Sequence, residues 1–170
     1  MELDKHTVGI EKDIQQVNFV SAKQKAMINL LYTYVCVIEK IKNFLSKDDI
    51  THQQFNILRI LRGSHPQPLS TLQIRERMLD KMSDTSRIVD RLVVKGLVRK
   101  SICPKDKRLV DVVITEKGQK LLKKIDSEAD HIEEIMGHLS EKEAEQLSVL
   151  LDRLRTTPSQ ETESSATQTY

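Results

Sequence analysis

The residues with the clearest chemical potential in this sequence lie between Ser83 and Arg87, where small polar side chains precede an arginine. A helix in the major groove of duplex DNA places its leading residues against base edges, and arginine can bond guanine through two donors. We therefore predict that Thr85, Ser86 and Arg87 contact bases, and we include Ser83 among the DNA-binding residues at the helix entry.

Three further residues, Ser70, Arg91 and Lys95, are predicted to contact phosphates rather than bases. Phosphate contacts set the position of a protein on the duplex and supply salt-dependent affinity without selecting a sequence. Asp84 and Asp90 place negative charge on or beside the same helix. Pairing of these acids with the arginine between them could hold that arginine in place or compete with a base.

A second basic group occupies the predicted turn Cys103-Pro-Lys-Asp-Lys-Arg108. A hairpin tip can carry a guanidinium into a narrow minor groove, where the negative potential of DNA is strongest. Arg108 is therefore the main DNA-binding candidate of this turn, with Lys105, Asp106 and Lys107 beside it. An ordinary solvated turn is the alternative interpretation of the same residues.

Positive charge is concentrated in one part of the chain. Between Arg75 and Arg108 there are eleven lysines and arginines and five acidic residues, a surplus of six, whereas the whole chain carries +2. The rest of the chain therefore carries 2 minus 6, or −4. Such a concentration is typical of a surface that binds a polyanion, although lysines and arginines can also merely solvate helix faces.

The hydrophobic spacing predicts helices upstream of these residues. A long helix is predicted from Ala22 to Leu45, a second helix begins at a cap on Thr51, and a short third helix begins at a cap on Ser70. The breaker-rich segment 63–68 forms the loop between the second and third helices.

The reading helix is predicted to begin near Ser83 and to end at Gly96. Its apolar stripe consists of Ile88, Val89, Leu92 and Val93. Segments 97–102 and 109–115 are short and rich in β-forming residues, so they are predicted to pair as a hairpin. The fold class is therefore mainly α with a small β-hairpin wing, in the element order of a winged helix-turn-helix.

Four short segments carry a family likeness through their order and spacing: Asp90-Arg-Leu, Lys95-Gly-Leu-Val98, Asp106-Lys-Arg108 and Ile114-Thr-Glu-Lys-Gly118. With these segments, the run from Leu69 to Lys124 resembles the MarR family of bacterial regulators, and with its flanking helices the likeness covers residues 22–155. The resemblance implies a homodimer with interlocked terminal helices and two DNA-reading lobes. It also implies that Asp106 orients Arg108.

The two ends of the chain are predicted to form the dimer. One long helix is predicted over residues 116–139 and another from 147 onward, both with apolar stripes that a small winged lobe cannot cover. The predicted organisation is an arm at 1–21, dimerisation helices at 22–46 and 116–155, a winged lobe at 50–115, and a disordered polar tail at 156–170. The DNA site is then an inverted repeat.

Other function classes find little support. The five histidines and two cysteines have no zinc-site spacing, and no glycine-rich phosphate loop occurs, so we expect no catalytic residue, metal or cofactor. No apolar run is long enough for a membrane span, and the first residues lack a signal core, so a cytoplasmic location is expected. The low aromatic content disfavours RNA or single-strand binding.

The signal that controls DNA binding is left open by the sequence. The resemblance implies either a small aromatic or phenolic effector or oxidation of a thiol. Cys36, near Tyr32 on the long first helix, is the candidate redox sensor, although a small core residue is the simpler interpretation. Cys103 lies at the base of the wing. A winged module used only for protein assembly is the alternative that needs no DNA target.

Overall fold

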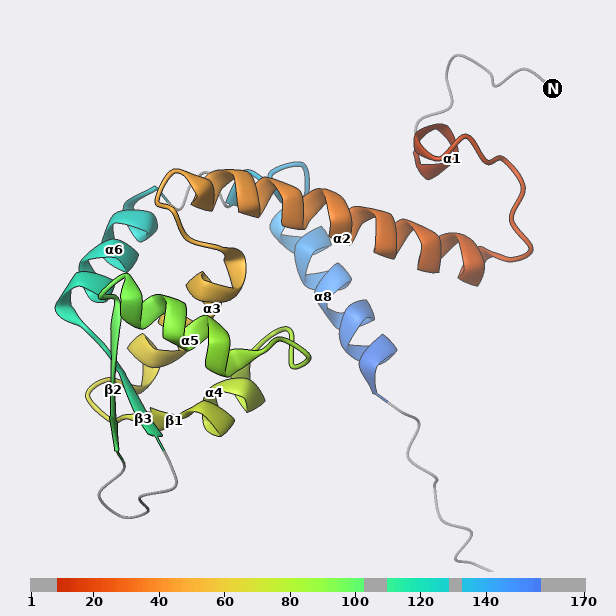
Figure 1. Ribbon diagram of the computed structural model, residues 1–170. Helices are drawn as coiled ribbons and strands as arrows, with labels where there is room; N and C mark the ends of the chain where they lie inside the picture. Colours follow the sequence, from red (N-terminus) through yellow and green to blue (C-terminus); the bar gives the residue numbers. More distant parts are fainter. Residues whose placement is uncertain (1–8, 103–109, 129–132, 157–170) are drawn as a thin grey trace, which may run out of the picture. The chain divides into compact units, whose positions relative to one another are not determined.

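The structure is a computed structural model that describes residues 9–102, 110–128 and 133–156. It divides into two units, one up to residue 132 and one from residue 133, and each is described by itself. The first unit contains the elements α1 (Ile10–Asp13), α2 (Ala22–Ser46), α3 (His52–Ser64), β1 (Leu69–Ser70), α4 (Thr71–Arg77), α5 (Thr85–Val94), β2 (Val98–Ile102), β3 (Val110–Ile114) and α6 (Glu116–Ser127) (Figure 1). The second contains α8 (Glu141–Arg155).

Side-chain caps define where the lobe helices begin. Thr51 and Ser70 each form a capping box. The hydroxyl accepts the backbone amide of Gln54 or Gln73, and the glutamine side-chain oxygen accepts the backbone amide of the cap residue. Both predicted caps are therefore confirmed. At the start of α5 the cap is the carboxylate of Asp84, which accepts the backbone amide of Arg87.

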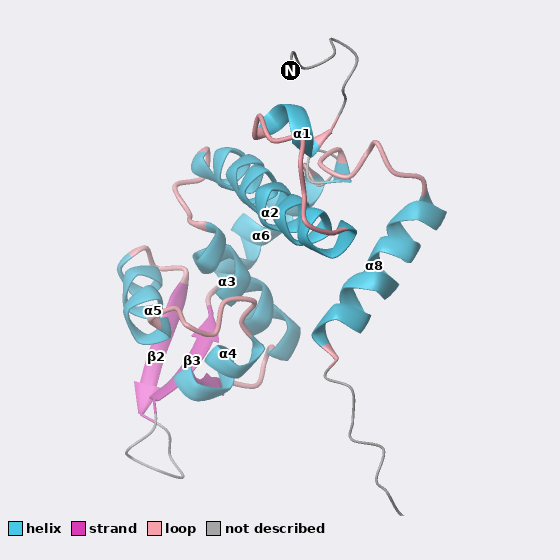
Figure 2. Cartoon of the chain, turned by 90° about the vertical axis from the view of Figure 1, so that its right-hand side faces the viewer, coloured by secondary structure: helices cyan, strands magenta, loops and turns pink. Residues whose placement is uncertain are grey.

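The sheet has three antiparallel strands in the order β1-β3-β2, so β3 lies in the middle. Figure 2 shows the paired strands β2 and β3 side by side. Val98 pairs with Ile114 and Leu69 pairs with Val112. The two-stranded wing is confirmed, and the two-residue strand β1 is an addition that was too short to give a sequence signal.

The core of the lobe lies between α3, α5, α6 and the sheet. Its largest side chains with less than 2% exposure are Leu45, Ile57, Leu58, Leu61, Ile74, Val89, Leu92, Val112, Leu122 and Ile125. They come from six different elements, so one continuous apolar cluster holds the lobe together.

The helices that flank the lobe are built differently. Within α2 the only buried residue is Leu45, at its C-terminal end, while Leu31 and Tyr34 are about 60% exposed. In the second unit, α8 has no buried residue. Both helices therefore leave large apolar side chains exposed in the single chain.

Two predictions about the ends need correction. The single helix predicted over 116–139 is wrong, because α6 ends at Ser127 and turns replace helix after residue 133. The Ser127 hydroxyl bonds the carbonyl of Lys124 and the amide of Glu128 bonds that of Ile125, a tight turn that stops the helix. The predicted arm also contains the short helix α1, tied to α2 by an ion pair between Glu11 and Lys25.

Candidate nucleic-acid interface

Helix α5 has one face in the core and one face in solvent. Val89 and Leu92 are completely buried, whereas Ser86, Arg87 and Arg91 are exposed. Within the described part of the chain, neither guanidinium has a hydrogen-bonding or ionic partner. The exposed face of α5 therefore presents a hydroxyl and two unpaired positive charges, which can bind an anionic surface.

The hydroxyls of Thr85 and Ser70 are used inside the protein. Thr85 is 5% exposed, and its Oγ1 lies 3.4 Å from the sulfur of Met78 and 3.4 Å from the carbonyl of Ser83. Ser70 is 9% exposed and its Oγ accepts the amide of Gln73. Both hydroxyls therefore have partners inside the protein, and the DNA contacts predicted for these two residues stay predictions.

The turn before α5 is organised by a carboxylate. Asp80 accepts the hydroxyl of Ser83 at 2.6 Å and the amide of Met82 at 3.0 Å. These two bonds, with the Ser83 bond the larger cause, lower the pKa of Asp80 below its usual value. Ser83 therefore stabilises the turn that leads into α5, through its bond to the Asp80 carboxylate.

The acidic residues of α5 do not neutralise its arginines. Asp84 accepts the backbone amide of Arg87 at 3.1 Å as the helix cap, and Asp90 forms an ion pair with Lys100 of strand β2. The pairing of these acids with the Arg87 side chain, considered from the sequence, is therefore absent among the described residues. Arg87 keeps its charge free for a ligand.

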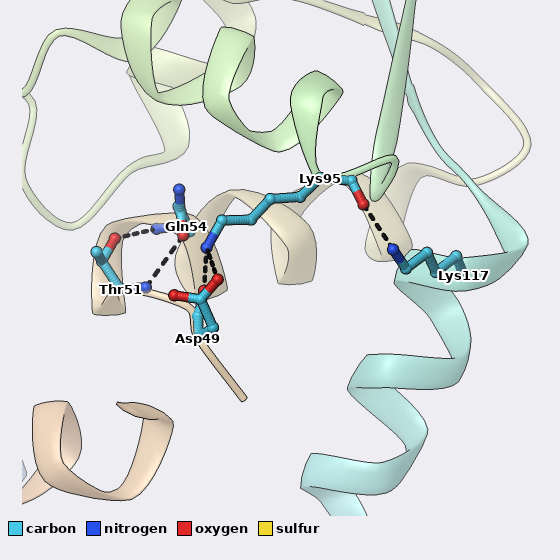
Figure 3. A network of polar contacts seen from close by, with 5 residues as sticks. All are labelled: Asp49, Thr51, Gln54, Lys95 and Lys117. Carbon is cyan, nitrogen blue, oxygen red and sulfur yellow. Dashed lines mark hydrogen bonds and ion pairs between the residues drawn. The ribbon is translucent and has the colours of Figure 1, made fainter. Parts of the chain in front are cut away.

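Lys95 takes part in an internal network at the far end of α5 (Figure 3). Its ammonium donates to the carboxylate of Asp49 at 3.0 Å and also to the backbone carbonyl of Asp49. In the structure the Lys95 ammonium is bonded to Asp49. The phosphate contact predicted for Lys95 would compete with these bonds.

The wing tip falls outside the described residues. Lys105, Asp106, Lys107, Arg108 and Cys103 all lie in the segment 103–109. The contacts predicted for these residues therefore stay predictions.

Two hollows border α5 and add candidates that the sequence analysis missed. One, between the α2–α3 turn and α5, is lined by Lys42, Gln53, Arg87 and Arg91 among others. The other lies at the start of α5, beside Ser86, and is also lined by Thr71 and Arg75 of α4. The four-residue spacing of Thr71 and Arg75 on α4 was the available signal, since it places both on one helical face.

Among the described residues, no cluster of histidine, cysteine, aspartate or glutamate could hold a metal ion. Cys36 is a half-buried free thiol on α2. The nearby charge of Asp13 and contact with Cys36 raise the pKa of Tyr32. In the same described part, no helix has the length and apolar character that crossing a bilayer requires.

Comparison with known proteins identifies the family. Residues 50–110 match the model of the MarR family. The HTH-type transcriptional regulator MhqR of Bacillus subtilis is 30% identical over 131 residues, which cover 76% of this chain and 89% of that protein.

Solved structures agree with this match. A MarR transcription factor from Planctomyces limnophilus has 34% identity and a TM-score of 0.63, covering 80% of this chain and 99% of its own. A mutant MarR from E. coli complexed with operator DNA has 22% identity and a TM-score of 0.69, covering 88% of this chain and all of its own, which shows a shared fold. The chain therefore belongs to the MarR family of transcriptional regulators, and the lobe from α3 to β3 is its DNA-binding winged helix.

Proposed function

We propose that this protein is a homodimeric, sequence-specific repressor that binds an inverted-repeat operator in duplex DNA and is released by a small ligand. The observation that carries the proposal is the exposed face of α5, where Ser86, Arg87 and Arg91 stand on a helix whose other face is locked in the core. In this proposal the protein binds its partner without catalysing a reaction.

The exposed residues divide by role. Ser86 and Arg87 lie in the first turn of α5, the part of a recognition helix that contacts base edges in the major groove. Arg91, one turn later, contacts a phosphate, and so does Arg75 beside the same helix start. The wing residues Lys105, Lys107 and Arg108 follow the minor groove, with Asp106 orienting Arg108.

Exposed apolar faces support a second copy of the chain as the partner. On α2 the exposed apolar residues are Met27, Leu30, Leu31, Tyr32, Tyr34 and Val35, and on α8 they are Leu147, Val149, Leu150 and Leu154. Such continuous stripes are costly in water and are usually covered by a partner. A twofold dimer would present two α5 helices about one turn of DNA apart, roughly 34 Å.

The hollow between the α2–α3 turn and α5 supports release of DNA by a ligand. It is lined by both exposed arginines, so an effector bound there would cover the groups proposed to contact DNA. A structural neighbour from Bordetella bronchiseptica, BpsR, is described as regulated in its DNA binding by 6-hydroxynicotinic acid. We propose a small aromatic or phenolic effector for this chain, and Cys36 as the site to examine for redox control.

Selection of bound fragments from random duplex DNA tests this proposal. The wild type should enrich two inverted half-sites, and Arg87→Ala should bind the enriched duplex with a free energy weaker by about 1–3 kcal/mol and with relaxed base preference. Arg108→Ala should also weaken binding. Lys120→Ala, which removes the same charge from the exposed face of α6, is the control. Unchanged affinity of both arginine variants at moderate salt would contradict the proposal.

A further inference from the structure

Lys95 connects three elements of the first unit. It is the C-cap residue of α5, and its ammonium binds both the carboxylate and the backbone carbonyl of Asp49. Its own carbonyl accepts the ammonium of Lys117, on α6, at 2.8 Å (Figure 3). One residue therefore joins the end of α5 to α6 and to the turn that follows α2.

The turn that holds Asp49 is itself well braced. Asp49 has a φ of 52°, in the left-handed region, and its amide bonds the carbonyl of Ser46. The neighbouring Asp48 binds the ammonium of Lys124 at 2.6 Å. Leu45 and Ile50 on either side are buried, so core packing holds both ends of this turn.

We propose that Lys95 is a positioning residue, which fixes the angle between α5 and α2 and thereby sets the distance between the two half-sites that a dimer can bind. This inference rests on the proposed function, because it requires two copies joined through α2. In a twofold dimer every change in the angle of α5 occurs in both copies, so a small local change alters the half-site spacing twice over.

The alternative role, a direct phosphate contact, predicts the opposite sign for one substitution. The Lys95 side chain is 29% exposed and its ammonium is already bonded to Asp49. If Lys95 served DNA directly, removal of the Asp49 charge would release it and strengthen binding. If Lys95 instead fixes the angle of α5, removal of the Asp49 charge weakens DNA binding.

The test repeats the selection from random duplex DNA with four proteins: the wild type, Lys95→Met, Asp49→Asn and a control, Glu116→Gln. Asparagine tolerates the left-handed backbone of position 49, so Asp49→Asn removes only the charge. Glu116 pairs with Lys120 inside α6, so its variant loses an ion pair elsewhere. Thermal unfolding of each protein identifies any general loss of stability.

We expect Lys95→Met and Asp49→Asn to enrich the same half-site sequence as the wild type, at a broader range of spacings. Affinity for the wild-type spacing should fall about two- to fivefold in both, the range of a single ion pair that is partly exposed. Glu116→Gln should keep the narrow spacing.

Three results would overturn the inference. Unchanged spacing in both variants would do so, as would tighter binding by Asp49→Asn together with a salt dependence for Lys95→Met that is lower by about one counterion. Absence of paired half-sites with the wild type would instead overturn the proposed function, and this inference with it.

Discussion

The winged lobe and the flanking helices use similar apolar residues in opposite ways. In the lobe, Leu58 and Leu92 have no exposed surface, whereas on α2 Leu31 is 61% exposed and on α8 Leu154 is 71% exposed. All four lie on amphipathic helices, so the difference comes from what each helix packs against. The lobe completes its own core, and the flanking helices leave theirs open.

This difference shows which part of the chain can fold by itself. Burial of apolar side chains stabilises the lobe by roughly 1.5–3 kcal/mol for each large residue, without help from another molecule. The exposed residues of α2 and α8 gain that energy only when a partner covers them. Stability of the lobe and association of the chains should therefore respond to different substitutions.

The largest expected effect is in the lobe. Leu92→Ala removes a completely buried side chain of α5 and should lower the free energy of unfolding by about 2–5 kcal/mol, because a cavity remains. Val94→Ala, on the same helix but 88% exposed, should change it by less than about 0.5 kcal/mol. Urea denaturation measures both. Equal effects would mean that α5 is not packed as described.

The next effect is in the flanking helices. Leu31→Glu places a carboxylate on the apolar stripe of α2 and should weaken the proposed dimer by about 3 kcal/mol, or roughly 150-fold in Kd, because the buried charge has no counterion. Thr33→Glu adds the same group on the other side of α2 and should have little effect. Sedimentation at several concentrations distinguishes them, and a dimer that tolerates Leu31→Glu would exclude this face.

The smallest expected effect is on the pH dependence of stability, through His52 at the boundary between α2 and the lobe. Burial, followed by the charge of Lys42 on α2, lowers the pKa of His52 below 6.5, and Asp80 opposes the shift. Among the described residues, its buried Nδ1 has no hydrogen-bond partner. In the unfolded chain His52 takes up a proton as the pH falls through about 6.5, whereas in the folded chain it does so only at a lower pH. The free energy of unfolding therefore decreases as the pH falls from 6.5 toward the pKa of His52 in the folded chain.

His52→Gln should therefore reduce the slope of unfolding free energy against pH between about 7 and 5. His138→Gln, at an exposed position of the second unit, is the control and should leave the slope as it is. Denaturation by urea at several pH values provides the measurement. An unchanged slope for the His52 variant would show that this histidine titrates alike in the folded and unfolded chain.

The sequence by itself determined the order of the main lobe helices and the two wing strands, the caps at Thr51 and Ser70, and the apolar face of α5. These depend on local signals, namely hydroxyl residues before helices and spacing close to 3.6 residues, which act within one or two turns of the chain. The family likeness rests on the same short segments. The exposed positions of Ser86, Arg87 and Arg91 follow from that spacing and agree with the structure.

Only the tertiary structure decided which polar side chains remain available. Asp90 pairs with Lys100, ten residues away in sequence, and Lys95 pairs with Asp49, 46 residues away. The side chain of Thr85 is buried in the core. Helical spacing cannot determine such contacts, because they depend on how separate elements pack. Local patterns showed which face of α5 is exposed, and long-range packing determined which polar side chains of the described residues have partners inside the protein.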